Sequence, residues 1–133
     1  MIEKKLYLKL IKLLPVLFII MCSCNHAPAK LSFDHPSIDV GKVKAGTTNI
    51  FTIKIRNTGD EELIIKEAKA ECGCTNIDIP KKTLLGNETG VVKISFTAFT
   101  VYPPNYKFKK SIVFLSNGAD KINDLTISGI IVK

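Results

Sequence analysis

The sequence has 133 residues, of which 46% are hydrophobic and 23% charged, and its formal net charge is +7. This length suits one domain with one modest hydrophobic core and argues against a second folded unit of ordinary size. Strand-forming Ile, Val, Thr and Phe are frequent and Trp is absent, which favours an all-β domain.

The first 23 residues have the layout of an export signal. Four lysines precede a mostly apolar stretch over residues 13–21, which is far shorter than the roughly 20 residues that a membrane-spanning helix needs. We therefore predict that residues 1–23 are a cleavable signal peptide. Its removal takes away those lysines and Glu3, which lowers the 19 basic and 12 acidic residues to 15 and 11, a net charge of +4.

The end of this leader, Met21-Cys22-Ser23-Cys24, resembles a lipobox, at which a cysteine thiol receives a diacylglyceryl group before the leader is cut. Cys24 is the better acceptor because the small Ser23 precedes it, whereas the bulky Met21 precedes Cys22. An ordinary signal peptide cut after Cys24 is the alternative. Residues 24–30 are polar and contain a proline, so we predict a short tether that links the lipid to a domain over residues 31–133.

The remaining positive charge does not favour nucleic acid as a partner. Lysines lie close together at residues 81–82 and 107–110, and they alternate with aromatic residues only over one short run, Tyr106-Lys107-Phe108-Lys109. Single-strand binding surfaces combine basic residues with aromatic stacking platforms. A solvated strand face is the simpler interpretation, and we predict no nucleic-acid partner.

From Leu31 onward, apolar and polar residues alternate and turn residues recur about every ten positions, as in a β-sandwich or barrel. Residues 31–40 form a first strand region broken at Pro36, and a bend and a turn follow over residues 41–46. The clearest strand covers residues 49–56, where apolar and polar side chains alternate strictly.

A turn at residues 57–60 precedes a strand over residues 63–71, in which a slip of the alternation between Ile65 and Ala68 predicts a bulge. A short strand over residues 75–79 ends at Pro80, and residues 80–90 are expected as a loop.

A second clear strand covers residues 92–98. Two prolines at residues 103–104 cannot join a central ladder, because proline lacks the N–H donor. Two closing strands over residues 107–115 and 124–132 are separated by a turn at residues 116–119. No stretch after residue 30 has sustained helical periodicity.

The chain resembles the DUF1573 family of bacterial exported proteins over nearly all of residues 31–133. The most specific part of the resemblance is the string Glu71-Cys72-Gly73-Cys74-Thr75 beside the turn Asn57-Thr58-Gly59. The resemblance implies an immunoglobulin-like antiparallel β-sandwich of about seven to nine strands and an exported location, but no established activity. The further matching positions are Phe33, Val40-Gly41-Lys42-Val43, Gly46, Phe51, Ile55, Leu63, Ile65, Gly86, Gly90, Val92, Ile94, Phe96, Lys110, Ser116-Asn117, Leu125, Ile127 and Gly129.

Cys72 and Cys74 are the cysteines that remain once the leader is removed and Cys24 is acylated. Three interpretations are open. The pair can be structural, as buried thiols or as a small disulfide at a strand end, with Gly73 allowing the tight turn. It can act as a redox pair, since two thiols two positions apart in an oxidising envelope can form an easily reduced ring. It can help to bind a metal, although only His26 and His35 are available as further soft ligands.

Other catalytic and cofactor patterns are missing from the sequence. There is no G-x-S-x-G nucleophile motif, no phosphate-binding glycine pattern and no Asp-x-Asp calcium loop. We therefore predict a protein that is not an enzyme, with no cofactor and no metal site.

The function that the sequence favours is a non-catalytic binding or structural module, anchored by its N-terminal lipid to the periplasmic face of the outer membrane. Its partner would be another envelope protein or a glycan. The alternative is a thiol redox or metal-handling protein that uses Cys72 and Cys74.

Overall fold

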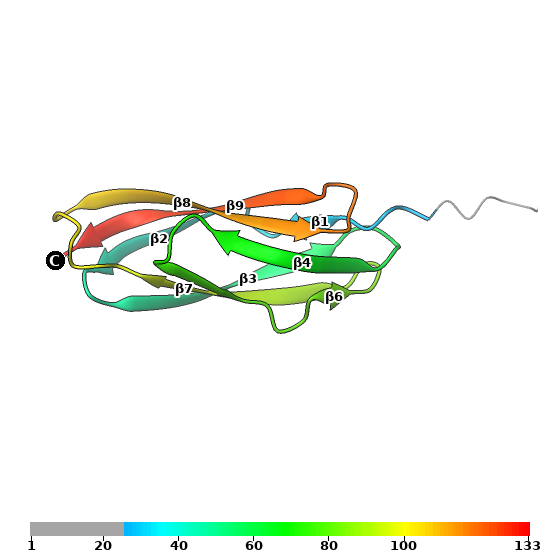
Figure 1. The fold of residues 1–133 in the computed structure, drawn as a ribbon, viewed down its shortest axis with the longest axis horizontal. Coiled ribbons are helices and arrows are strands. Elements are labelled where there is room, and N and C mark those ends of the chain that lie inside the picture. The colour runs from blue at the N-terminus through cyan, green and yellow to red at the C-terminus, as the bar shows by residue number, and fades with distance from the viewer. Residues whose placement is uncertain (1–25) are drawn as a thin grey trace, which may run out of the picture.

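The computed structural model describes residues 26–133, which form nine β-strands in two stacked sheets (Figure 1). This part of the chain contains no helix, so the predicted all-β sandwich is confirmed. The predicted signal peptide, Cys22 and Cys24 lie outside the described residues.

The two sheets are built from strands far apart in the sequence. The four-stranded sheet has the order β1 (Leu31–Phe33), β3 (Thr48–Asn57), β7 (Thr89–Thr97) and β5 (Thr75–Asp78). The five-stranded sheet has the order β2 (Ser37–Lys44), β9 (Ile122–Val132), β8 (Tyr106–Ser116), β4 (Leu63–Ala70) and β6 (Thr83–Leu84). The N-terminal segment and the C-terminus lie at opposite ends of the sandwich (Figure 1).

The first predicted strand region is divided between the sheets. β1 pairs with β3, and after Pro36 the chain joins the other sheet as β2, which runs parallel to β9 from Ser37 opposite Thr126 to Lys44 opposite Val132. All the other strand pairs are antiparallel. The expected antiparallel sandwich is therefore found with one parallel pair, β2 with β9, at the edge of the five-stranded sheet.

Two irregularities in the strands have a clear backbone cause. In β4 the register shifts between Ile65 and Glu67, which confirms the predicted bulge. In β2 the register shifts between Asp39 and Lys42, and Gly41 has a φ of +69° that favours glycine. The bend expected near Gly41 is therefore a bulge inside a continuous strand.

The predicted loop over residues 80–90 contains one short strand. β6 pairs with the start of β4, with Leu84 opposite Leu63, and Leu84 is completely buried. Two residues are too few to show an alternating pattern, which is why the sequence did not reveal this strand.

The core lies between the sheets and is formed by the inward-facing side chains of both. Phe96 stacks on Phe108 with ring centroids 4.4 Å apart, and Phe33 lies at an angle to Phe114 at 5.1 Å. Ile53 and Ile55 of β3 are buried as their alternation predicts, whereas Phe51 is only partly buried. Full burial of each large apolar side chain contributes about 1.5–3 kcal/mol to stability.

Candidate functional site

The corner between β4 and β5 carries the cysteine pair. Cys72 and Cys74 form a disulfide with their Cα atoms 5.2 Å apart, at the point where the chain passes from the five-stranded to the four-stranded sheet. The backbone N–H of Thr75 donates to the Cys72 carbonyl at 3.3 Å, which closes the turn. The disulfide therefore joins two residues of one tight corner and no distant parts of the fold.

The two sulfur atoms of this corner differ in their surroundings. Cys74 is 4% exposed and belongs to the hydrophobic core, whereas Cys72 is only partly buried. The Thr75 hydroxyl lies 3.8 Å from each sulfur. Cys72 is thus the less buried residue of the disulfide.

The opposite part of the molecule is organised by Asn57 at the end of β3. Asn57 is completely buried, and its side-chain oxygen accepts hydrogen bonds from the backbone N–H groups of Lys30 and Gly59, each at 3.1 Å. Its amide nitrogen donates to the carbonyls of Glu61, Leu84 and Leu85 at 2.7–3.2 Å. One side chain therefore joins three segments of the chain.

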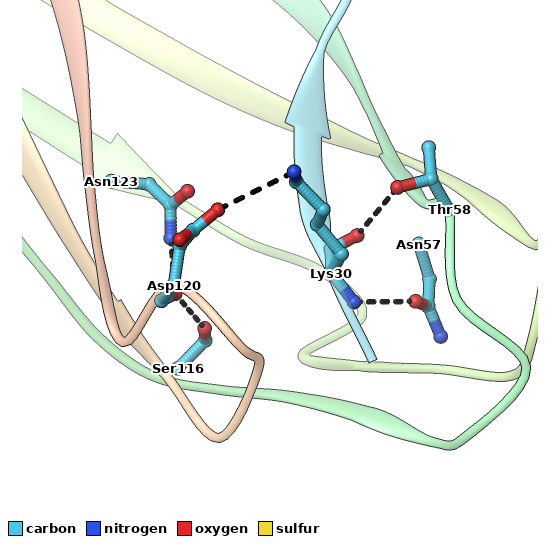
Figure 2. Close-up of polar contacts among 6 residues, drawn as sticks. All are labelled: Lys30, Asn57, Thr58, Ser116, Asp120 and Asn123. Atoms are coloured by element: carbon cyan, nitrogen blue, oxygen red, sulfur yellow. Dashed lines mark hydrogen bonds and ion pairs between the residues drawn. The ribbon is translucent and has the colours of Figure 1, made fainter. Parts of the chain in front are cut away.

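The N-terminal segment, defined here as Ala27–Lys30, lies among these segments. The Lys30 carbonyl accepts hydrogen bonds from the Thr58 N–H at 2.9 Å and from the Thr58 hydroxyl at 3.4 Å. Figure 2 shows the bond from the hydroxyl and the Lys30 ammonium, which lies 3.6 Å from the Asp120 carboxylate. The Ala29 carbonyl accepts from the Ala119 N–H at 2.8 Å, and Ala29 is 3% exposed. The Ala27 carbonyl accepts from the Asp60 N–H at 2.9 Å.

These contacts bear on the predicted tether over residues 24–30. Its part Ala27–Lys30 is hydrogen-bonded to turns of the sandwich and is not a free link, whereas the first strand, β1, begins at Leu31. No local sequence pattern indicates these contacts, because the partners of the segment are backbone groups of turns that lie elsewhere in the chain.

Glycines make room for the segment and for the turns around it. A Cβ atom at Gly59 would lie 1.9 Å from the Pro28 carbonyl oxygen, and one at Gly118 would lie 2.9 Å from the Ala29 carbonyl oxygen. A Cβ atom at Gly86 would lie 2.4 Å from the Asp60 carbonyl oxygen. The sequence identified the turn at residues 57–60 but not this close approach of a second backbone.

An ion pair at the surface holds the neighbouring turn. Glu88 accepts hydrogen bonds from the Lys81 ammonium and from the backbone N–H of Leu85 at 2.8 Å. The hydrogen bond from Lys81, with that from Leu85, holds the pKa of the Glu88 carboxyl below its ordinary value of 4.5. The pair is solvent-accessible, so its effect on stability is small.

No metal centre is formed within residues 26–133, where no group of three or more His, Cys, Asp or Glu side chains is placed to hold an ion. His35 is exposed beside Pro36 at the break between β1 and β2. In the same part of the chain, no helix is long and apolar enough to cross a bilayer.

Residues 31–131 match the family described as "Protein of unknown function (DUF1573)". The chain belongs to this family. No curated protein matches the DUF1573 chain.

Solved structures similar to this DUF1573 domain show a common fold at low identity. A protein of unknown function from Porphyromonas gingivalis W83 superposes with a TM-score of 0.65 at 12% identity, over 77% of this chain and 46% of that one. The seventh PapD-like domain of human CEP192 gives a TM-score of 0.63 at 10% identity, over 80% of this chain and 87% of that domain. The periplasmic chaperone SfaE gives 0.56 at 10% identity, over 77% and 57%. The fold is therefore a PapD-like, immunoglobulin-like β-sandwich.

Proposed function

We propose that this DUF1573 protein is a lipid-anchored binding or structural module of the bacterial cell envelope. Its lipid would be attached to Cys24, and its partner would be another envelope protein or a glycan. The fold is one that a periplasmic chaperone and a domain of CEP192 also use, and such sandwiches serve many functions, so the assignment depends on the features of this chain.

The observation that carries the proposal is the attachment of the N-terminal segment to one end of the sandwich. Cys24 is three residues before Ala27, so a lipid on Cys24 could lie at most about 11 Å from the domain. Such a short link would hold the end of the sandwich with Asn57 and Asp120 near the membrane surface. The long sides and the far end would then remain accessible to partners (Figure 1).

Radiolabelled palmitate tests the anchor in bacterial cells that express the full-length chain. We expect the native chain and Cys22→Ala to be labelled and to sediment with the outer membrane. Cys24→Ala should remain unlabelled. An unlabelled native chain, or a Cys24→Ala variant that is still labelled, would overturn the lipid assignment, and sedimentation with the inner membrane would overturn the proposed location.

A thiol redox role is the second candidate, and the unequal burial of Cys72 and Cys74 favours it. A thiolate of an envelope oxidoreductase would attack the Cys72 sulfur, form a mixed disulfide with it and release Cys74 as a thiolate. A second thiolate would then resolve the mixed disulfide. The result would be reduced Cys72 and Cys74 and an oxidised partner.

Titration of the full-length chain in thiol–disulfide buffers, followed by alkylation, tests this second role. Structural disulfides of exported proteins have reduction potentials below about −300 mV, whereas catalytic pairs lie above that value. A midpoint above about −300 mV would support the redox candidate, and a lower midpoint would exclude it.

A further inference from the structure

One side of the sandwich, between β4 and β5, has two free strand edges. β5 is the last strand of its sheet, and β6 pairs only with Leu63 and Ile64 at the start of β4 (Figure 1). The Ile65 N–H still donates to the Lys82 carbonyl at 2.8 Å. Beyond Ile65, no strand of residues 26–133 pairs with the outer edge of β4.

The register of β4 shows which backbone groups point outward. The Glu71 N–H donates to the Ser111 carbonyl of the neighbouring strand at 3.0 Å. Successive residues of a strand direct their N–H and C=O groups to alternate sides, so Glu67 and Lys69 also face β8. Ala68 and Ala70 therefore present their N–H and C=O groups to the free edge.

The same reasoning applies to β5. The Thr97 N–H of β7 donates to the Cys74 carbonyl at 2.8 Å, so Asn76 and Asp78 also face β7. The N–H and C=O groups of Ile77 then point away from β7, toward the free edge of the four-stranded sheet. Both edges of this side carry unpaired backbone groups.

A groove of about 620 Å³ lies between these edges, and we call it the β4–β5 groove. Its apolar lining consists of Ala68 from β4, Ile77 and Ile79 from the β5 region, and Leu115 from β8. Ala68, Ile77 and Ile79 are only partly buried. The small side chain of Ala68 leaves space that a larger residue at this core-facing position would fill.

The charges around the β4–β5 groove are mainly positive. Lys66 and Lys82 line it, and neither forms an ion pair within residues 26–133. The acidic residue of the lining, Glu67, is already paired with Lys69 at 3.0 Å. An occupant with carboxylates opposite Lys66 and Lys82 would complement these charges.

We propose that the β4–β5 groove binds an extended, acidic segment of a partner protein as an additional strand on β4. Backbone groups of the segment would pair with Ala68 and Ala70, and every second side chain would be apolar and face Ile77 and Ile79. Carboxylates of the segment would lie near Lys66 and Lys82. The inference rests on the proposed binding function and specifies its partner as a peptide strand, not a glycan.

Lysines on an edge strand also have a protective role, because they hinder edge-to-edge association. The two roles predict different results. A protective lysine repels any added strand, whereas a binding lysine increases the affinity for an acidic strand. The test therefore compares Lys66, which lines the groove, with Lys44, an exposed lysine on β2 at the other edge of the same sheet.

The test uses the full-length chain in detergent and a fluorescent peptide of about eight residues in which Val and Glu alternate. Fluorescence anisotropy should show saturable binding. The affinity should fall at least about ten-fold for Lys66→Glu and less than about three-fold for Lys44→Glu. Lys44→Glu is the matched control because it makes the same charge change on β2, at the other edge of the same sheet, where Lys44 neither lines the groove nor forms an ion pair within residues 26–133.

Two further variants test the strand-like mode of binding. Ala68→Pro removes the outward N–H of an edge residue, and Ala68→Leu fills the groove without removing any backbone donor. Each should weaken peptide binding at least about ten-fold. Circular dichroism identifies variants that do not fold. If Ala68→Pro does not fold, the binding results for Ala68→Leu and Lys66→Glu still decide the test.

Three results would overturn the proposal. The first is no saturable binding up to about 1 mM peptide, and the second is an equal loss of affinity for Lys66→Glu and Lys44→Glu. The third is a dimer of the native chain that Ala68→Pro abolishes, since a second copy of the chain would then occupy the edge. Palmitate labelling of the same preparations separates the two ideas. If the chain is labelled but does not bind the peptide, the proposed peptide site is excluded and the lipid anchor is supported. If the chain is unlabelled but binds the peptide, the lipid anchor is excluded and the peptide site is supported.

Discussion

The end of the sandwich around Asn57 and the side between β4 and β5 differ in whether their backbone N–H and C=O groups are paired. At the Asn57 end, a buried amide and two glycine-containing turns hold the N-terminal segment, and the N–H and C=O groups there find partners. Along β4 and β5, strand edges remain unpaired and border a groove. The first region is suited to holding the fold together, and the second is suited to receiving another chain.

Asn57→Ala should give the largest loss of stability, because it removes the hydrogen-bond partners of several buried backbone groups at once. We expect a decrease of about 3–4 kcal/mol in the free energy of unfolding. Denaturant unfolding measures it. Asn76→Ala is the control, because Asn76 is exposed on β5 and should change stability by less than about 0.5 kcal/mol. Similar losses for both variants would contradict the central role of Asn57.

Gly59→Ala should release the N-terminal segment, because the added Cβ would overlap the Pro28 carbonyl oxygen. We expect a loss of about 2 kcal/mol and faster tryptic cleavage after Lys30, whose backbone is hydrogen-bonded in the native chain. Gly73→Ala is the matched control, since a Cβ atom at Gly73 would meet nothing within 4 Å. Unchanged cleavage after Lys30 in Gly59→Ala would refute this role of the glycine.

Removal of the disulfide should have a smaller effect than either change at the Asn57 end. The bond closes a loop between residues only two positions apart, so the chain-entropy model gives about 1–2 kcal/mol for Cys72→Ala/Cys74→Ala. Thermal unfolding of the native chain with a reductant should show a similar loss. The unfolding temperature of the double variant should not change with the reductant. A change in that temperature would show that the reductant acts on something other than this disulfide.

Glu88→Gln should have the smallest effect, since the pair with Lys81 is accessible to solvent. The folded-state pKa of Glu88 is lowered, so its contribution is present above the ordinary value of 4.5 and is lost as the pH falls through the lower folded-state value. The native chain should therefore be slightly more stable than Glu88→Gln at pH 7, and the difference should vanish in acid. Glu62→Gln is the control, because Glu62 lies at an exposed turn and forms no ion pair within residues 26–133, so its stability at pH 7 should equal that of the native chain.

Local patterns predicted much of this protein. The alternation over residues 49–56 and 92–98 predicted β3 and β7, and the slip between Ile65 and Ala68 predicted the bulge in β4. The short strand β6 was missed because its two residues carry no pattern. The parallel pairing of β2 with β9 was missed because alternation does not say which strand lies alongside.

The candidate sites also differ in whether a local sequence pattern predicts them. The sequence identified Cys72 and Cys74, because two cysteines with one residue between them form a local feature. It assigned Asn57 only to a turn, although the structure places the side chain among three segments of the chain. The β4–β5 groove could not be predicted at all, since Ala68 and Ile77 are ordinary strand residues until their sheets are stacked.

The sequence by itself determined that strands form, where most of them run and which of their faces is apolar, because side-chain alternation follows from the geometry of one extended backbone. Only the tertiary structure decided which backbone groups find partners, because that depends on segments brought together from distant positions. Around the buried amide of Asn57 these backbone groups are paired, and along the open edge of β4 they are not.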